Sequence, residues 1–459
     1  MLRVAVVGAG PSGVYTAQDL VAQTRVPDVR VHVLDRLPCP YGLVRYGVAP
    51  DHERIKSLQG TLRSVLEDER IEFLGHVEVG RRGLGPRRLL DLYHAVVYCV
   101  GASRDRRLGI PGEDLPGSHS ATDFVAWYSA HPDAAGAGFD LSGRSAVVIG
   151  AGNVAVDVAR MLARDPDTLR PTDLPEGVLA ALEHGGVRQV WMAARRGPSQ
   201  ARFTTKELRE LGALPGTDLR VDPADLVRDP AYTDPERAAE LPAVARRNLA
   251  VVREWAAQQA RQAADGPTAG AADRRCVRLR FFLRPVALLE SGGAVGAVRF
   301  ERTVPDGAGG LRGTGTYEEI EAHLVLRAVG YRGAPLPGLP FDVERGTVPH
   351  RAGRVLREGV PSPGEYVAGW IKRGPTGVIG SNRPCAKETV GSLLDDAEAL
   401  ARRRVAADPL AELTAAGGPP VRWSGWEAIV AAEAELGRRL GRGPVKIPDW
   451  AGLLAAAGG

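Results

Sequence analysis

Cysteine is scarce in this 459-residue chain, and its four cysteines lie far apart at Cys39, Cys99, Cys276 and Cys385. No two of them form a C-x-x-C pair, and their spacing matches no iron–sulfur ligand set. The sequence therefore excludes an electron relay through a neighbouring dithiol, and we expect no metal site. We interpret the thiols as buried or incidental groups in a reducing compartment.

Long apolar runs and lysine are also missing. No uninterrupted apolar stretch is long enough to span a bilayer, so we expect no membrane insertion. Only five of the 59 basic residues are lysines, the net charge is +4, and the basic residues are scattered rather than striped, which argues against nucleic-acid binding. The first apolar segment begins close to Met1 and leaves no room for a signal peptide, so we expect a cytoplasmic protein.

What is present is typical of a globular protein with more than one domain. The hydrophobic content of 44% and the charged content of 25% are ordinary for such proteins. A chain of this length is too long for one hydrophobic core, which predicts two domains or a little more.

Two glycine-rich turns, about 140 residues apart, each follow an apolar run. In such a turn the first glycine allows a tight bend, the second lets the backbone approach a pyrophosphate, and the third position must be small so that helix and strand pack closely. The phosphates then rest at a helix N-terminus. Two turns predict two dinucleotide sites, and hence a flavoprotein supplied by a nicotinamide nucleotide. The turns are Gly8-x-Gly10-x-x-Gly13 and Gly150-x-Gly152-x-x-Ala155.

The strands predicted after the two turns end in opposite charges. The first, at 31–35, ends in Asp35, whose carboxylate can accept hydrogen bonds from a ribose diol and repels a 2′-phosphate. The second, at 187–194, is followed by Arg195 and Arg196, whose guanidinium groups can bind a phosphate in bidentate fashion. We therefore predict FAD or NAD at the first turn and NADP at the second.

Two further apolar strands, at 95–101 and 324–330, end in Val-Gly and predict where the chain crosses between domains. We expect an FAD-binding domain built from residues 1–102 and 330–459, the latter part ending in a helical tail. An NADP-binding domain, residues 103–329, is expected to be inserted between them. Within the insert, the pattern predicts a long polar-faced helix over 235–264 and loops over 265–274 and 306–315. The arginine-rich face of that helix could meet an acidic partner, although a solvated face is the simpler interpretation.

Three longer segments are more specific than the glycine turns: Pro40–His52, Arg195–Glu210 and Gly369–Gly380. With them, in order from residue 2 to about residue 400, the chain resembles the adrenodoxin reductase family, whose bacterial members are NADPH-ferredoxin reductases of the FprA type. The resemblance implies an α/β, glutathione-reductase-like fold with two Rossmann-like dinucleotide-binding domains, the NADP domain inserted in the FAD domain.

The resemblance also implies cofactor contacts at matching positions. The family usually has glutamate where Asp35 stands, and the shorter acid should still reach the ribose. Gly377 is expected to contact the nicotinamide nucleotide as well as the flavin. The implied FAD contacts are Ser12, Asp35, Leu43, Val79, Trp370, Gly377, Val378 and Ile379. The implied NADP contacts are Arg106, Asn153, Val154, Ala155, Val156, Arg195, Arg196 and Glu207.

The resemblance further implies that His52, with an acid of the 207–210 segment, lies near the nicotinamide and the flavin and assists proton movement or cofactor orientation. We name His52 and Glu210 as these groups. At the glycine-rich segment 374–380, backbone N–H groups before a helix over about 385–402 would stabilise negative charge on a reduced flavin. The alternative is a plain loop capped by Ser381 or Asn382. The segment Arg383–Ala386 departs from the relatives, which leaves the shape of this loop open.

The expected activity is hydride transfer from NADPH to FAD, followed by release of single electrons to a ferredoxin. Because no dithiol is present, the electrons would leave from the flavin itself. The resemblance to the family further implies that the ferredoxin passes these electrons to a cytochrome P450 or a similar final acceptor. Two alternatives stay open: an FAD/NADPH-dependent monooxygenase, and a non-enzymatic nucleotide-sensing protein. The tail after about residue 405 contains Trp423, Trp426 and Trp450, which we interpret as packing anchors.

Overall fold

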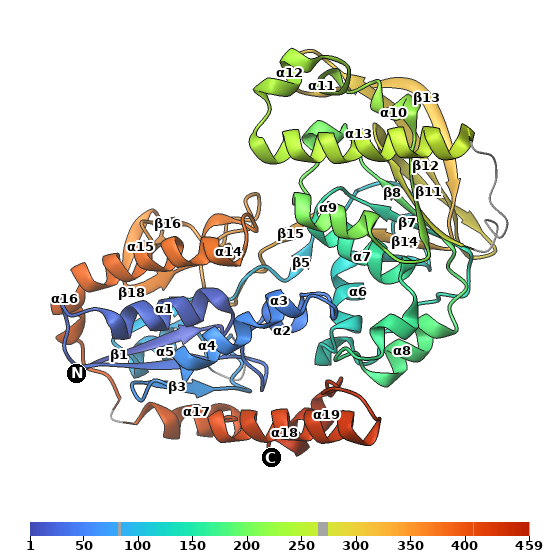
Figure 1. Ribbon diagram of the computed structural model, residues 1–459. Helices are drawn as coiled ribbons and strands as arrows, with labels where there is room; N and C mark the ends of the chain where they lie inside the picture. The colour runs from blue at the N-terminus through green and yellow to red at the C-terminus, as the bar shows by residue number, and fades with distance from the viewer. Residues whose placement is uncertain (81–83, 265–273, 407, 459) are drawn as a thin grey trace. The chain divides into compact units, whose positions relative to one another are not determined.

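The computed structural model describes residues 1–80, 84–264, 274–406 and 408–458. The chain divides into two compact units, each with its own sheet (Figure 1). The first unit contains residues 1–106, 129–133 and the chain from Gly330 onward, and the second contains 107–128 and 134–329. The predicted domain boundaries differ from this division, because residues 103–106 and 129–133 pack with the first unit.

The first unit is built on a seven-stranded sheet in the order β16-β17-β18-β4-β1-β2-β3. Strands β1 to β4 and β18 run parallel, whereas β16 and β17 form an antiparallel edge. The strands are β1 (Leu2–Val7), β2 (Val29–Leu34), β3 (Ile71–Leu74), β4 (Ala95–Tyr98), β16 (His350–Arg351), β17 (Arg354–Arg357) and β18 (Val360–Val367). A separate pair, β5 (Arg104–Asp105) and β15 (Tyr331–Arg332), joins the two crossing segments.

Strand β1 explains why the first apolar run is continuous rather than alternating. Successive strand residues point to opposite faces of a sheet. Val4 and Val6 enter one hydrophobic cluster, and Ala5 and Val7 enter another. Both faces are covered, as is usual for a parallel sheet, and the carboxyl end of β1 is thereby fixed at the first glycine turn.

The last part of the first unit, which was expected to end in a helical tail, contains the helices α17, α18 and α19. The predicted helix over about 385–402 is two helices, α15 and α16, separated at Asp396. Helix α1 packs against α15, so the turn that precedes α1 is held by a segment more than 350 residues away. The helices are α1 (Pro11–Ala22), α2 (Leu43–Tyr46), α3 (Glu53–Lys56), α4 (Leu58–Leu66), α5 (Pro86–Leu92), α14 (Trp370–Arg373), α15 (Asn382–Asp395), α16 (Ala397–Ala401), α17 (Pro409–Gly417), α18 (Trp423–Arg439) and α19 (Trp450–Ala456).

The second unit has a six-stranded parallel sheet in the order β6-β14-β7-β8-β10-β9 and a three-stranded antiparallel sheet in the order β11-β12-β13. The two faces of β7 again feed different clusters, with Ala146 and Val148 on one side and Val147 and Ile149 on the other. The strands are β6 (Ser118–Ser120), β7 (Ser145–Ile149), β8 (Gln189–Ala193), β9 (Thr217–Val221), β10 (Arg275–Arg280), β11 (Leu283–Ser291), β12 (Ala294–Pro305), β13 (Leu311–Glu321) and β14 (Leu324–Arg327).

Two predictions for the second unit are wrong in part. The helix expected over 235–264 is broken at Leu241 and Pro242, because proline lacks the N–H that a helix interior needs. The loop expected over 306–315 is a short turn, and β13 already begins at Leu311. The loop expected over 265–274 lies almost wholly outside the described residues. The helices are α6 (Ala121–Tyr128), α7 (Asn153–Ala163), α8 (Glu176–Glu183), α9 (Thr205–Gly212), α10 (Pro223–Leu226), α11 (Pro230–Thr233), α12 (Pro235–Glu240) and α13 (Ala243–Ala264).

Two of the arginines of α13 make hydrogen bonds within the protein. Arg253 donates hydrogen bonds to the carbonyl oxygens of Ala231 and Tyr232, and Arg246 donates to that of Ala239. These two side chains therefore brace the neighbouring helices. Among the helices that the structure describes, none is long and apolar enough to cross a membrane. All four cysteines are free and buried.

Candidate functional site

The first glycine turn tolerates no larger residue at its first and third positions. Gly8 has φ +111°, and a Cβ there would lie 2.5 Å from the carbonyl oxygen of Cys99. A Cβ on Gly13 would lie 1.8 Å from the carbonyl oxygen of Gly8. The carboxyl end of β1 and the start of α1 are therefore in contact, as the phosphate-binding turn requires.

The segment from Tyr41 to Tyr46 lies directly on this turn. The N–H of Tyr41 donates to the carbonyl oxygen of Ala9 at 2.8 Å, and Tyr41 has a positive φ of 81°. A Cβ on Gly42 would lie 3.0 Å from the Cα of Gly10. Leu43, an implied flavin contact, is 39% exposed at the start of α2. Gly42 was not predicted as a site residue, and its only signal in the sequence is its place between Tyr41 and Leu43 in the segment Pro40–His52.

Asp35 follows β2 at the position predicted for the ribose-binding acid. Its Oδ2 accepts a hydrogen bond from the N–H of Ala9 at 2.7 Å, and its Oδ1 accepts one from the N–H of Leu37 at 2.9 Å. Burial raises the pKa of Asp35, and these two donors act against the rise. Each carboxylate oxygen can accept a second hydrogen bond, so the group remains able to bind a diol. Val79, a further implied contact, is buried after β3.

The segment that follows β18 brings Gly369 and Trp370 to the first glycine turn. A Cβ on Gly369 would lie 2.4 Å from the Oγ of Ser12, and the N–H of Gly369 donates to the Sγ of Cys385 at 3.2 Å. The indole Nε1 of Trp370 is buried and has no hydrogen-bond partner within the described part of the chain. A buried donor of this kind calls for an acceptor, and the polar edge of an isoalloxazine ring offers one. The residues present thus fit a flavin.

Segment 374–380 is a loop with side-chain caps. The N–H of Val378 donates to the Oγ of Ser381 at 3.2 Å, and Asn382 donates from Nδ2 to the carbonyl oxygen of Ile379 at 3.0 Å. Gly377 has φ +82°, and Val378 is 63% exposed. The capped loop that was the alternative interpretation is therefore observed, while flavin contacts from Gly377, Val378 and Ile379 stay a prediction.

The second glycine turn shares the backbone of the first but has open space above it. A Cβ on Gly150 would lie 2.4 Å from the carbonyl oxygen of Ala328, so this position is closed to larger residues. A Cβ on Gly152 would meet nothing within 4 Å. Ala155 is fully buried in the first turn of α7, where its methyl group replaces the third glycine. Val154 and Val156 also lie in this first turn of α7.

Asn153 has a structural contact that the sequence did not reveal. Its Oδ1 accepts a hydrogen bond from the N–H of Thr204 at 2.8 Å, and the N–H of Arg202 donates to the carbonyl oxygen of Ala151 at 2.8 Å. Thr204 in turn caps α9, accepting a hydrogen bond from the N–H of Glu207. The second glycine turn therefore positions the start of α9. The T-x-x-E pattern of Thr204 and Glu207 was a readable signal for this cap.

Arg195 and Arg196 follow β8, as predicted. Among the residues that the structure describes, neither guanidinium makes a hydrogen bond or an ion pair, and Arg195 is exposed. The turn behind them is held by Asp229, which accepts hydrogen bonds from the N–H of Ser199 at 2.8 Å and from its Oγ at 2.9 Å. Two uncompensated positive charges on a fixed turn are suited to a phosphate.

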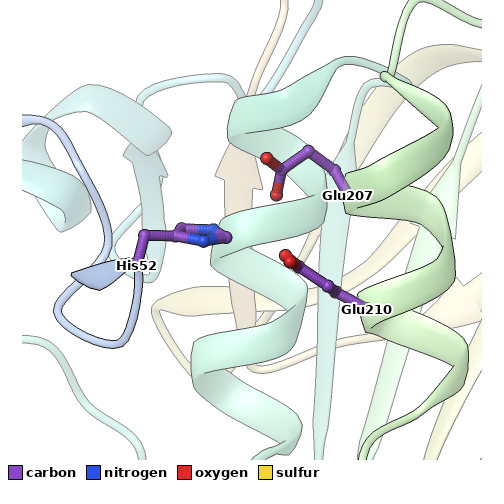
Figure 2. Close-up of side chains that lie close together, drawn as sticks. All are labelled: His52, Glu207 and Glu210. Atoms are coloured by element: carbon purple, nitrogen blue, oxygen red, sulfur yellow. The ribbon is translucent and has the colours of Figure 1, made fainter. Parts of the chain in front are cut away.

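Glu207 and Glu210 lie on the same side of α9, one turn apart (Figure 2). Glu207 is buried, and Oε1 of Glu210 lies 3.3 Å from the Nζ of Lys206. Figure 2 also labels His52, which is buried at the start of α3 in the first unit. Arg106, expected in the inserted domain, belongs to the first unit, where its N–H donates to the carbonyl oxygen of Gly330 at 3.0 Å. The roles of these four residues stay predictions.

Comparisons with known proteins agree on one type of molecule. A family model described as pyridine nucleotide-disulphide oxidoreductase matches residues 2–166. The chain is 44% identical to the NADPH-ferredoxin reductase FprA of Mycobacterium tuberculosis over 98% of both chains. It is 39% identical to the mitochondrial NADPH:adrenodoxin oxidoreductase of Arabidopsis thaliana, covering 99% of this chain and 95% of that one. The solved structure of Mycobacterium tuberculosis FprA in complex with NADPH matches with a TM-score of 0.90 at 42% identity over the whole of both chains.

Proposed function

Because the chain belongs to the family of FprA-type NADPH-ferredoxin reductases and adrenodoxin reductases, we propose that it oxidises NADPH and delivers electrons singly to a ferredoxin. It is an FAD-dependent oxidoreductase that uses NADP(H). We place FAD in the first unit and NADPH in the second.

The observation that carries this assignment is the contrast at the two ribose positions. Asp35 presents a carboxylate already held by two backbone donors, which suits a diol and disfavours a phosphate. Arg195 and Arg196 present two positive charges without partners in the described chain, which suit the 2′-phosphate that separates NADPH from NADH.

The bound flavin supplies the conversion of a two-electron hydride into single electrons, which a nicotinamide cannot perform. The protein holds and orients the reactants. The first glycine turn offers the N-terminus of α1 to a pyrophosphate, and the indole N–H of Trp370 supplies a buried donor. We propose that His52 and Glu210 orient the nicotinamide or move a proton beside it, a supporting role because hydride transfer itself needs no general base.

Stepwise titration of the purified protein tests the proposal. The visible spectrum is recorded, the protein is titrated anaerobically with NADPH and separately with NADH, and an oxidised ferredoxin is added at the end. We expect a yellow protein that is bleached preferentially by NADPH and reoxidised by the ferredoxin. A colourless protein that takes up no FAD would favour a nucleotide sensor, and NADPH consumption coupled to oxygenation of an organic compound would favour a monooxygenase.

Two finer assignments complete the proposal. A ferredoxin that receives single electrons can supply a cytochrome P450 or a similar acceptor, and we propose such an acceptor here. We also propose that the protein acts in the cytoplasm. Reconstitution of the protein with a ferredoxin and a P450 would test the first assignment, and cell fractionation would test the second.

A further inference from the structure

The C-terminal tail, residues 409–458, contacts segment 41–46 of the first unit through buried charges. We call segment 41–46 the flavin-side segment, because it contains Leu43, an implied flavin contact. Arg45 of α2 donates from NH2 to Oε1 of Glu433 in α18 at 2.6 Å. Lys446, which follows α18, donates from Nζ to the carbonyl oxygen of Arg45 at 2.6 Å and to that of Ser129 at 3.2 Å. The exposed fractions of Arg45, Glu433 and Lys446 are 3%, 5% and 3%.

These three charges are linked rather than merely close. The N–H of Ile447 donates to Oε1 of Glu433 at 2.9 Å, and the N–H of Val445 donates to the carbonyl oxygen of Glu433 at 3.0 Å. Glu433 therefore fixes the position of Lys446 as well as that of Arg45. Burial by itself would lower the pKa of Arg45, but the neighbouring carboxylate of Glu433 raises this pKa well above its ordinary value. Removing Glu433 would take its counter-charge from the buried Arg45, and removing Lys446 would take their donor from the carbonyl oxygens of Arg45 and Ser129; both losses are unfavourable in a buried place.

The segment held in this way has a backbone that needs support. Tyr41 has a positive φ of 81°, an unusual conformation for a residue with a side chain, and Gly42 touches the first glycine turn. The ring of Trp426 in α18 packs edge-on against Tyr41 at 5.7 Å, and the guanidinium of Arg45 lies 5.0 Å from the same indole. Strained backbone persists only where its surroundings determine it. Here the surroundings are supplied by the tail.

The tail also forms part of the wall of a cavity beside Arg36. A cavity of about 530 Å³ is lined on one side by Arg36, His76, Val77 and Glu78, and on the other by residues of α17, Gly418 and Trp450. Its volume is typical of a ligand pocket. Arg36 directly follows Asp35 and β2 ends at Leu34, so the cavity lies close to the carboxyl end of β2, the end at which a Rossmann unit binds its ligand.

Trp450 also anchors the tail beside the cavity. Its Nε1 donates to Oδ1 of Asp133 at 2.9 Å, and Asp133 also accepts a hydrogen bond from NH2 of Arg36 at 2.6 Å. The guanidinium of Arg36 lies 5.5 Å from the indole ring of Trp450. In Figure 1 the three tail helices, in red, lie together along the strands of the first unit, and α18 contacts β3.

We propose that the C-terminal tail is a clamp that retains FAD, with Glu433 and Lys446 positioning the flavin-side segment 41–46 and Trp450 closing the adenosine side. The inference rests on the proposed placement of FAD in the first unit. Glu433 and Lys446 act as positioning residues through segment 41–46, whereas Trp450 lines the cavity itself.

The rate of FAD release from the holoprotein tests the clamp. Release is followed by the rise of flavin fluorescence after dilution, for the wild type and for Glu433→Gln, Lys446→Met and Trp450→Leu. We expect release at least about tenfold faster in all three variants, because each removes a buried counter-charge, a buried donor or an anchoring indole. The matched control is Glu435→Gln in the same helix, which removes only surface ion pairs to Arg438 and Arg439 and should release FAD at the wild-type rate.

A second measurement separates the two sides of the clamp from a general loss of stability. ADP is used to compete with FAD for the flavin-free protein. We expect Trp450→Leu to weaken ADP binding and Glu433→Gln to leave it unchanged, since only Trp450 lines the cavity beside Arg36. If Glu433→Gln does not fold, Lys446→Met and Trp450→Leu carry the test.

Wild-type release rates in the three variants, or equal loss of ADP affinity in Trp450→Leu and Glu433→Gln, would overturn the clamp. A wild-type protein that binds no FAD would instead overturn the proposed function. A protein that binds FAD but loses it no faster when the tail is altered would leave the proposed function standing and refute this inference alone.

Discussion

The two glycine turns follow the same pattern, a strand that ends at a glycine with positive φ and a helix that begins after the second glycine, but they have different surroundings. The first is covered by other parts of the first unit: a Cβ on its middle glycine, Gly10, would contact the Cα of Gly42 at 3.8 Å, and Gly369 lies against Ser12. The second is open above Gly152, where a Cβ would meet nothing within 4 Å. A covered site suits a cofactor that stays bound through many turnovers, and an open site suits a nucleotide that must bind and leave in each one.

The same contrast holds for charge. At the first turn, Asp35 is buried and its carboxylate is held by the N–H groups of Ala9 and Leu37. At the second turn, Arg195 is exposed and lacks a partner within the described residues. At the first site the carboxylate of Asp35 is therefore already held by backbone N–H groups. At the second site the guanidinium group of Arg195 is left for the phosphate that we propose it binds.

The largest effect is expected from adding one methyl group to each turn. Gly13→Ala should abolish FAD binding, because its Cβ would collide with the carbonyl oxygen of Gly8, and overpacking of this kind costs about 1–3 kcal/mol or more. Gly152→Ala should keep the fold and the FAD content but weaken NADPH binding, because the methyl group stands where the pyrophosphate approaches. Flavin absorbance, thermal unfolding and the KM for NADPH measure these effects. A yellow, stable Gly13→Ala protein would show that the third position of the first turn accepts a methyl group, as Ala155 does in the second turn.

A second effect should be confined to the open site. Replacing Arg195 and Arg196 together with alanine removes two charge-assisted contacts of about 1.5–3 kcal/mol each, so NADPH should bind about 100-fold more weakly or worse while NADH changes little. Dissociation constants for both nucleotides measure the difference. Ser199→Ala, which only removes a hydroxyl bound to Asp229, serves as a control in the same turn. Equal losses for NADPH and NADH would show that the arginines do not recognise the 2′-phosphate.

A smaller effect is expected at His52. His52→Ala should slow flavin reduction by NADPH by less than the roughly 100-fold that removal of a general base produces, because hydride transfer needs no base. Stopped-flow reduction under anaerobic conditions measures the rate, with FAD content as the check on folding. An unchanged rate would remove His52 from the reaction.

The smallest effect compares the acid sensitivity of the two units. Burial lowers the pKa of His32, His94, His131 and His350 in the first unit and of His119 in the second. The unfolded chain then takes up protons first as the pH falls below about 6.5, so stability decreases on acidification. Because His119 and His350 are only partly buried, solvent screening keeps their contributions small. Hydrogen exchange at pH 7 and pH 5.5 should show the larger loss of protection in the first unit. Equal losses in both units would contradict this expectation.

Local features of the sequence predicted much of the fold and part of the site. The apolar runs at 4–7 and 146–149, each followed by glycine, are buried strands that end at tight turns, because that pattern satisfies a purely local requirement. Asp35, Arg195 and Arg196 were readable for the same reason, since each lies at a strand end whose place in a Rossmann unit is known. Pro242 was also readable as a helix breaker, although the periodic pattern around it led us to predict one helix instead of two.

Other residues could not be predicted, because their roles depend on partners far away in the chain. Asn153 supports Thr204, 51 residues later, and Arg45 pairs with Glu433, 388 residues later. The aromatic residues of the tail were interpreted as packing anchors. Trp426 is indeed buried in the core, but Trp450 also donates a hydrogen bond to Asp133 and lines a cavity.

The two nucleotide units, the opposite charges that follow β2 and β8 and the lack of a C-x-x-C dithiol could be read from the sequence, because each depends on residues that are close together in the chain. Which glycine turn is covered and which is open, and which buried charges of the tail meet segment 41–46, became known from the folded chain. Those properties arise from contacts across hundreds of residues, and no local pattern in the chain encodes such contacts.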